Sequence, residues 1–418
     1  MSDVGGGVLN GCMIAGTDVR NLVFTIEYFE SIYSSTASAN ITLNDAAGFY
    51  HNSGLKGSEE VSFSFGARSG DSIKMNFQVG ILGDRTRAKD NQDMYMITCV
   101  PKEFINQNQK EIVKAYKEKK VSDMAKEFHD EYVKDSNTLK KDLVTNESTE
   151  GKQNYFGTGR SPVTAIRWAA KEGKSSEAKA SNYVYYQDRD GYHFRTIDKM
   201  LQSGSVAELS YSAQNIGDAG GDPSNKIIAF DQKNDLNNVD SSFNGADSDH
   251  WYYYDPTTGK VAGGSKRDGP GDTTHTGKDT ITNKQDSARG ERFNFVIAPG
   301  ATKSKTRDAR DPKIAETKRT LQEHGANSSA AVQLDNLVMN IRVPGNTSFK
   351  PGVKVKLSIP ANQEEGTLDK RSGDFLVTSI RHILYRDDKD FKYECILECK
   401  SDSHSKSSPS GTGGTSNG

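Results

Sequence analysis

Apolar and polar residues alternate through the first hundred positions of the chain. Phe24, Ile26 and Tyr28 follow this period of two, and the pattern returns in the stretches VSFSFG, IKMNFQVGIL and MYMITCV. A period of two is typical of strands that bury one face, and the Asn, Asp and Gly clusters between the stretches favour turns. Residues 1–103 are therefore predicted to form an antiparallel β-barrel or sandwich domain.

The period changes after Pro101. Between residues 104 and 133, apolar positions recur at helical spacing, first at Ile112, Val113 and Tyr116 and then at Met124, Ala125, Phe128 and Tyr132. This spacing predicts two helices separated near Lys120. Ser122 is the expected N-cap of the second helix, and Asp123 is an acid in its first turn.

A third helix and a hairpin follow. Ser161 is the expected N-cap of this helix, Pro162 suits its first position, and Gly173 is the expected stop. Aromatic residues then alternate in YVYYQDRDGYHF around a turn at Asp190-Gly191, which predicts a β-hairpin. Residues 104–205 are accordingly predicted to form a small α+β domain.

Strand patterns return after residue 206, but a polar stretch interrupts them. Residues 236–329 hold few apolar anchors beyond WYYYDPTTGKV and RFNFVI, so they are predicted to be a loop-rich insertion. Strands resume at LDNLVMNIRVPG, VKVKLSIP, GDFLVTSIRHILY and FKYECILEC. Residues 206–235 and 330–400 are thus predicted to form a second β-domain. Residues 401–418 are a polar Gly/Ser tail that cannot form a core and is expected to be mobile in the isolated chain.

Composition favours assembly. Hydrophobic residues make up 33% of the 418 residues, and the mean hydropathy is −0.73, so a single sphere of this size would be underfilled. A chain of this kind is expected to be elongated or to bury apolar surface against other chains. The 54 basic and 56 acidic residues give a net charge of −2, which argues against specific nucleic-acid binding. We expect neither a secretory leader nor a membrane span.

The sequence predicts no catalytic, cofactor-binding or metal-binding residues. Zinc-hydrolase, nucleophile-elbow and phosphate-loop motifs do not occur, and the Asp-rich run DQKNDLNNVDSSFNGADSDH lacks the glycine and closing glutamate of a calcium loop. The four cysteines lack CxxC spacing and are expected to be reduced and partly buried. Four histidines lie in separate segments and are expected to be structural or surface groups: His129, His193, His250 and His382.

Four stretches, in this order, resemble the central hub protein of contractile-tail phage baseplates, the T-even-like hub family, and more remotely the hub-like part of type VI secretion spikes. They are MYMITCVPKEF with the following KEKKVSDMAKEFHDEYV, then SPVTAIRWAAKEG with YVYYQDRDGYHF, then VPGNTSFKPGVKVKLSIP, and finally GDFLVTSIRHILY with YECILEC. Together they extend over nearly the whole chain.

The resemblance implies an α+β multidomain protein with two small antiparallel, tube-like β-barrels, a helix-and-hairpin domain and the loop-rich insertion. It implies a homotrimer whose six β-domains surround a channel for the tape measure and DNA, joining a three-fold spike to a six-fold tail tube. The implied partners are the spike protein, tail tube initiator proteins, the tape measure protein and inner baseplate (wedge) proteins. The implied location is the baseplate of the virion tail, after assembly in the host cytoplasm.

Other interpretations remain open. A hub of a type VI or other contractile injection system would share the fold. A tail-associated cell-wall hydrolase would need two carboxylates in a cleft, and sequence spacing singles out no such pair. The aromatic hairpin either faces neighbouring baseplate proteins or fills the core of its own domain, and the C-terminal tail either lies along the spike or makes no contacts.

Overall fold

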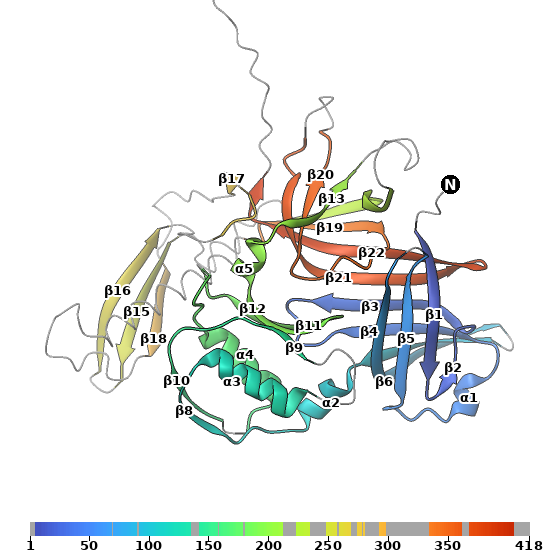
Figure 1. Cartoon of the computed structure of the whole chain (residues 1–418), viewed down its shortest axis with the longest axis horizontal. Helices are drawn as coiled ribbons and strands as arrows, with labels where there is room; N and C mark the ends of the chain where they lie inside the picture. The colour runs from blue at the N-terminus through green and yellow to red at the C-terminus, as the bar shows by residue number, and fades with distance from the viewer. Residues whose placement is uncertain are drawn as a thin grey trace, which may run out of the picture.

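The computed structural model describes residues 5–404 except for residues 69, 90–91, 135–141, 158, 179, 212–222, 235–247, 257–258, 269–273, 278, 281–291, 298–333 and 362–367. Strands dominate the described residues and helices are few, so the architecture is mostly β rather than evenly α+β, and the expected multidomain organisation is confirmed (Figure 1). One sheet of 13 strands unites the two ends of the chain.

The N-terminal part of this sheet is a series of antiparallel strands. The predicted alternation is confirmed there, because Ile26, Tyr28, Ile41 and Leu43 are all buried. Phe24 is an exception, since an irregularity between Val23 and Thr25 shifts the register and leaves its ring exposed. The elements of this part are β1 (Gly6–Ile14), β2 (Thr17–Asp18), β3 (Val23–Ser31), β4 (Ser38–Asp45), α1 (Phe49–Ser53), β5 (Glu60–Ala67), β6 (Ser72–Lys89) and β7 (Gln92–Val100).

Two C-terminal strands close these N-terminal strands into a ring. Strand β21 (Gly373–Asp387) pairs with β3, strand β22 (Asp390–Ser401) pairs with β1, and the two also pair with each other. The resulting cycle of pairings runs β3-β4-β7-β6-β5-β1-β22-β21 and returns to β3. Gly7 permits the close approach of β1 to both strands of this hairpin, because a Cβ there would lie 2.9 Å from Tyr393 Cβ of β22 and 2.6 Å from Leu384 Cδ1 of β21.

The same β21–β22 hairpin belongs to a second group of strands. This group has the order β13-β20-β21-β22-β19-β14, and a bridge joins Ser210 of β13 to Lys226, in the segment that precedes β14. Its further elements are β13 (Ser205–Ser210), the 3-10 helix η2 (Pro223–Asn225), β14 (Ala229–Asn234), β19 (Leu337–Pro344) and β20 (Lys354–Ser358). Both groups share one continuous apolar core. Whether they correspond to two tube-like barrels, and the domain boundaries themselves, stay predictions.

The third predicted helix and its caps are confirmed. Helix α4 (Pro162–Glu172) begins after Ser161, whose Oγ accepts a hydrogen bond from the Thr164 N–H, and ends before Gly173. The hairpin consists of β11 (Tyr183–Asp188) and β12 (Gly191–Thr196), with β9 (Leu143–Asn146) parallel to β12. Asp188 pairs with Gly191, so the loop is Arg189-Asp190 and the predicted turn was wrong by one residue.

The first of the two predicted helices after Pro101 is largely wrong. Helix α2 (Lys102–Asn108) ends early, and Ala115–Lys119 is strand β8, paired with β10 (Gln153–Phe156). The second helix is present as α3 (Val121–Phe128), continued by the π-helix η1 (His129–Val133). Its N-cap position is Lys120 rather than Ser122, whose Oγ instead accepts a hydrogen bond from the Thr149 N–H at 3.2 Å. Helix α5 (Ile197–Leu201) follows the hairpin.

The two apolar anchors of the insertion lie in strands. The three strands β15 (Ser248–Asp255), β16 (Lys260–Asp268) and β18 (Arg292–Ile297) form a separate sheet, at the left of Figure 1. Strand β17 (Asp279–Thr280) pairs instead with β23 (Ser403–His404). Ser401, Asp402 and Ser403 are buried, so the predicted polar tail does not begin at residue 401. The tail prediction for residues 405–418 lies outside the described residues.

Candidate functional site

The tip of the β11–β12 hairpin is inserted into the sheet. Arg189, in the hairpin loop, donates through its guanidinium to the carbonyl oxygens of Thr347 and Phe349. Its backbone N–H donates to Glu30 Oε1 at 2.6 Å, and its Nη2 lies 3.4 Å from Glu30 Oε2. Glu30 is buried in β3, and Arg189 is 8% exposed. This pair therefore joins the helix-and-hairpin region to the ring of strands through a desolvated ion pair.

The ion pair continues into β21 and β22. His382 Nε2 lies 3.7 Å from Glu30 Oε2, while His382 Nδ1 lies 2.7 Å from the Tyr393 hydroxyl and 3.3 Å from Cys395 Sγ. The Tyr28 hydroxyl donates to Glu30 Oε1 at 2.9 Å. We call Tyr28, Glu30, Arg189, His382, Tyr393 and Cys395 the junction cluster.

Charge within the junction cluster shifts the pKa values of its members. Burial alone would raise the pKa of the Glu30 carboxyl, but the Arg189 charge and a hydrogen bond from His382 outweigh burial and lower it. Burial would lower the pKa of His382, yet Cys395 and Glu30 raise it. Burial would likewise raise the pKa of the Cys395 thiol, which the His382 charge lowers. The surroundings thus favour the ionised forms of Glu30, His382 and Cys395, whereas burial raises the pKa values of Tyr28 and Tyr393 and keeps their hydroxyls neutral.

A thiol, an imidazole and a carboxylate in contact are the parts of a nucleophilic site. Here Cys395 and His382 are fully buried and Glu30 is 2% exposed, so this side-chain set offers a substrate no access. The geometry supports a structural role, in which every charge has a partner. The other three cysteines are also buried and free, as expected: Cys12, Cys99 and Cys399.

The remaining histidines are structural where their side chains are described. His129 Nδ1 lies 2.8 Å from the Tyr185 hydroxyl in the core of the helix-and-hairpin region, and His193 Nε2 lies 3.0 Å from Asp188 Oδ1. His250 is a residue of β15, and its side chain lies outside the described residues, as do residues 235–247 of the Asp-rich run. Among the described residues, no group of His, Cys, Asp and Glu is arranged to hold a metal ion.

The aromatic residues of the hairpin fill their own core. Tyr185, Tyr192 and Phe194 are buried and pack with α3 and α4, and Tyr186 packs in a smaller cluster with α5. Tyr186 also contacts the large sheet, since its cluster includes Ile32 and Leu376, and Arg189 adds the buried ion pair with Glu30. Sequence reasoning missed Arg189, although an arginine in a two-residue hairpin loop and a glutamate at an inward position of a strand are both unusual.

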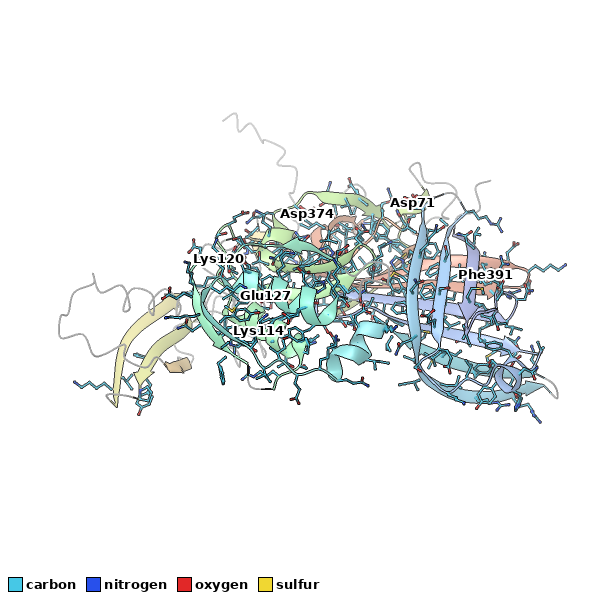
Figure 2. The ribbon with its side chains drawn as sticks, turned by 60° about the horizontal axis from the view of Figure 1, so that its bottom comes forward. Asp71, Lys114, Lys120, Glu127, Asp374 and Phe391 are labelled. Atoms are coloured by element: carbon cyan, nitrogen blue, oxygen red, sulfur yellow. The ribbon has the colours of Figure 1, made fainter. Side chains whose placement is uncertain are left out.

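A charged cluster covers the outer side of α3 (Figure 2). Lys114 Nζ donates to Glu127 at 2.5 Å and to Glu131 at 2.7 Å, while Lys119 also pairs with Glu127 and stacks over the Tyr116 ring. Partial burial would raise the pKa of the Glu127 carboxyl, but hydrogen bonds from Lys114 and Lys119 lower it to about 2. These pairs fasten β8 to α3 on the surface.

The insertion is fastened to the end of the last long strand. Asp402 accepts hydrogen bonds from the Thr276 N–H at 2.9 Å and the Thr276 hydroxyl at 2.6 Å, and its Oδ2 lies 2.6 Å from His275 Nδ1. Thr274 N–H donates to Asp198 Oδ1 in α5 at 2.9 Å. Residues 274–277 therefore form a polar latch between α5, β22 and β23.

Within the described residues, no helix is both long enough and apolar enough to cross a membrane. No protein-family model and no curated protein matches the sequence. Solved structures do match. The tail protein from Neisseria meningitidis MC58 has a TM-score of 0.58 and 13% identity, covering 95% of this chain and 97% of that chain. The 43 kDa tail protein of prophage MuSo2 from Shewanella oneidensis has a TM-score of 0.58 and 8% identity, covering 96% and 100%.

These similarities define the fold: the chain has the fold of phage tail proteins over nearly its whole length. The resemblance to the central hubs of contractile-tail baseplates, drawn from four stretches of sequence, is confirmed at the level of this fold. A component of the E. coli type VI secretion system is more distant, with a TM-score of 0.45, 10% identity and coverage of 94% of this chain and 76% of that chain.

Proposed function

We propose that the protein is a structural component of a contractile tail, and in particular the central hub of the baseplate. In this role three copies join a three-fold spike to the six-fold tail tube and surround a channel for the tape measure and DNA. The observation that carries the proposal is the mutual, nearly complete coverage between this chain and two phage tail proteins.

The strand pairings support the proposed symmetry. Each chain contributes two groups of strands that share the β21–β22 hairpin, so three chains would contribute six groups. A trimer of such chains can match both a three-fold and a six-fold partner. The shared hairpin and shared core would hold the two groups of one chain in a fixed relation, as an adaptor between two symmetries requires.

The proposed partners are the spike, the tail tube initiator proteins, the tape measure protein and the inner baseplate proteins, and the proposed location is the virion baseplate. We propose no enzymatic activity. The alternative of a cell-wall hydrolase has no support in the junction cluster, whose reactive groups are buried. A hub of another contractile injection system remains the second candidate, because it would share this fold.

Mass photometry of the purified chain, alone and with its spike protein, tests the proposal. Three chains of 45.8 kDa give a particle of about 137 kDa. We expect a particle of this mass for the trimer without the spike, and of this mass plus that of the spike for the complex. A particle that keeps the mass of a single chain under both conditions would contradict the trimer.

A further inference from the structure

A pocket of about 270 Å³ lies on the outer face of the ring, where β1, β5 and β6 run side by side. Met13, Ser62 and Asn76 face it from opposed positions on the three strands, and Glu60 and Gln78 form the next row. Their neighbours Val61, Met75 and Phe77 point into the core, which directs these side chains outward. Lys102, at the start of α2, closes one side.

The polar side chains of this pocket have no partner of their own. Gln78 is only 7% exposed, yet its carboxamide forms no hydrogen bond with any other residue that the structure describes. The same holds for the side chains of Ser62 and Asn76 within that part of the chain, and Glu60 and Lys102 form no ion pair there. A largely buried carboxamide is normally hydrogen-bonded, so its open donors and acceptor indicate a ligand from outside the chain.

The turn after β1 keeps the pocket accessible. Gly16 has a φ of +76°, a conformation that favours glycine, and a Cβ at this position would have no heavy atom within 4 Å. The turn therefore holds its backbone beside the pocket without a side chain that could fill it.

We propose that this pocket binds a short peptide segment of another protein. Two carboxamides and a hydroxyl supply donors and acceptors that match the N–H and C=O groups of a peptide. Glu60 and Lys102 supply one charge of each sign, which gives a phosphate-rich polyanion no net attraction. The thioether of Met13, 38% exposed, offers an apolar contact for one side chain.

The pocket volume limits the ligand to one or two residues inserted from a longer chain. It falls below the roughly 300–1,000 Å³ that is usual for pockets that enclose a drug-sized molecule. This inference does not depend on the hub function. Binding of a peptide probe here is measured separately from trimer formation.

Methyl NMR of the full chain, with its 8 methionines labelled, tests the proposal, since the Met13 methyl group reports on the pocket. The probe is the blocked tripeptide N-acetyl-Gly-Gln-Gly-amide, and trehalose and sodium phosphate are the comparison ligands. We expect a saturable shift of the Met13 signal, assigned with Met13→Leu, in the millimolar range that few contacts allow, up to about 10 mM.

The double variant Asn76→Ala/Gln78→Ala should weaken tripeptide binding at least about tenfold, the loss of roughly 1.4 kcal/mol of affinity. Unchanged signals from the other methionines would show that the fold is retained. Lys74→Ala, an exposed position on the same face of β6, is the matched control and should bind as the native chain does. The proposal is overturned if the tripeptide causes no shift, if only trehalose or phosphate does, or if the double variant binds equally well.

Discussion

Replacing Arg189 by methionine should loosen the hairpin from the ring of strands. The change keeps the length of the side chain but removes the donors to Thr347 and Phe349 and leaves the Glu30 carboxylate buried without its main partner. Removing one member of a buried ion pair usually costs about 3–5 kcal/mol. At about 1.4 kcal/mol per factor of ten, local opening should become roughly two to three and a half orders of magnitude more frequent.

Two backbone amides report this opening because their hydrogen bonds cross the junction. The Arg189 N–H donates to Glu30, and the Ala37 N–H donates to Gln187 Oε1 of the hairpin. Residue-resolved hydrogen exchange should show both amides losing protection in the variant, while amides bonded within the β11–β12 hairpin keep theirs.

The matched control is Lys350→Met, which removes an ion pair at the same hairpin tip. Lys350 pairs with Asp190, whose side chain is 44% exposed, so the expected cost is only about 0–1 kcal/mol. Adding Glu30→Gln to the Arg189 variant should restore part of the protection from hydrogen exchange, because it removes the buried carboxylate charge that Arg189 no longer pairs with. The reasoning fails if the Arg189 variant exchanges no faster than the Lys350 control.

Three further predictions concern the junction cluster, the N-cap of α4 and the latch at Asp402. The pKa of Glu30 is lowered in the folded protein, so its carboxylate stabilises the junction fully above about pH 4.3, and this stabilisation is lost as the pH falls through the folded value. The pKa of His382 is raised, so its imidazolium stabilises the junction fully below about pH 6.5, and this stabilisation is lost as the pH rises through the folded value. The junction amides should therefore be best protected between these limits, after correction for intrinsic exchange rates. Ser161→Ala should destabilise α4 by about 1 kcal/mol in local hydrogen exchange, and Ser161→Gly by only a few tenths. Asp402→Asn should make residues 274–277 at least about tenfold more sensitive to protease, because the latch loses charge-assisted hydrogen bonds.

Each of these predictions has a result that would count against it. Protection that changes steadily in one direction from pH 3 to pH 8, roughly the span of both ordinary pKa values, would contradict the opposed titrations. Equal effects of alanine and glycine at residue 161 would mean that the cap contributes little. Cleavage of the Asp402 variant at the native rate would show that the β17–β23 pairing alone holds the latch.

Local signals determined what could be predicted from the sequence. Helix α4 was predictable because Ser161, Pro162 and Gly173 act on the backbone beside them. Strand β8 was not, because Ile112, Val113 and Tyr116 have helical spacing while the strand that pairs with β8 lies more than thirty residues further along.

The closure of the ring of strands could not be predicted from the sequence either. Ser31 pairs with Ser379, and no local pattern specifies the register of strands so far apart in the sequence. The pocket beside Gln78 depends on two other registers, those of β1 with β5 and of β5 with β6, which place Ser62 opposite both Met13 and Asn76. For the junction cluster, the alternating pattern of β3 does place Glu30 at an inward position, on the face that carries Ile26 and Tyr28, and a charge at such a position is an unusual signal.

Electron cryomicroscopy of the purified chain bound to its spike protein tests the central claim most directly. The account predicts a particle with three copies of the chain, in which the two strand groups of each copy form a ring of six around an open channel. A single copy on the spike, or three copies whose strand groups do not surround a common axis, would contradict it.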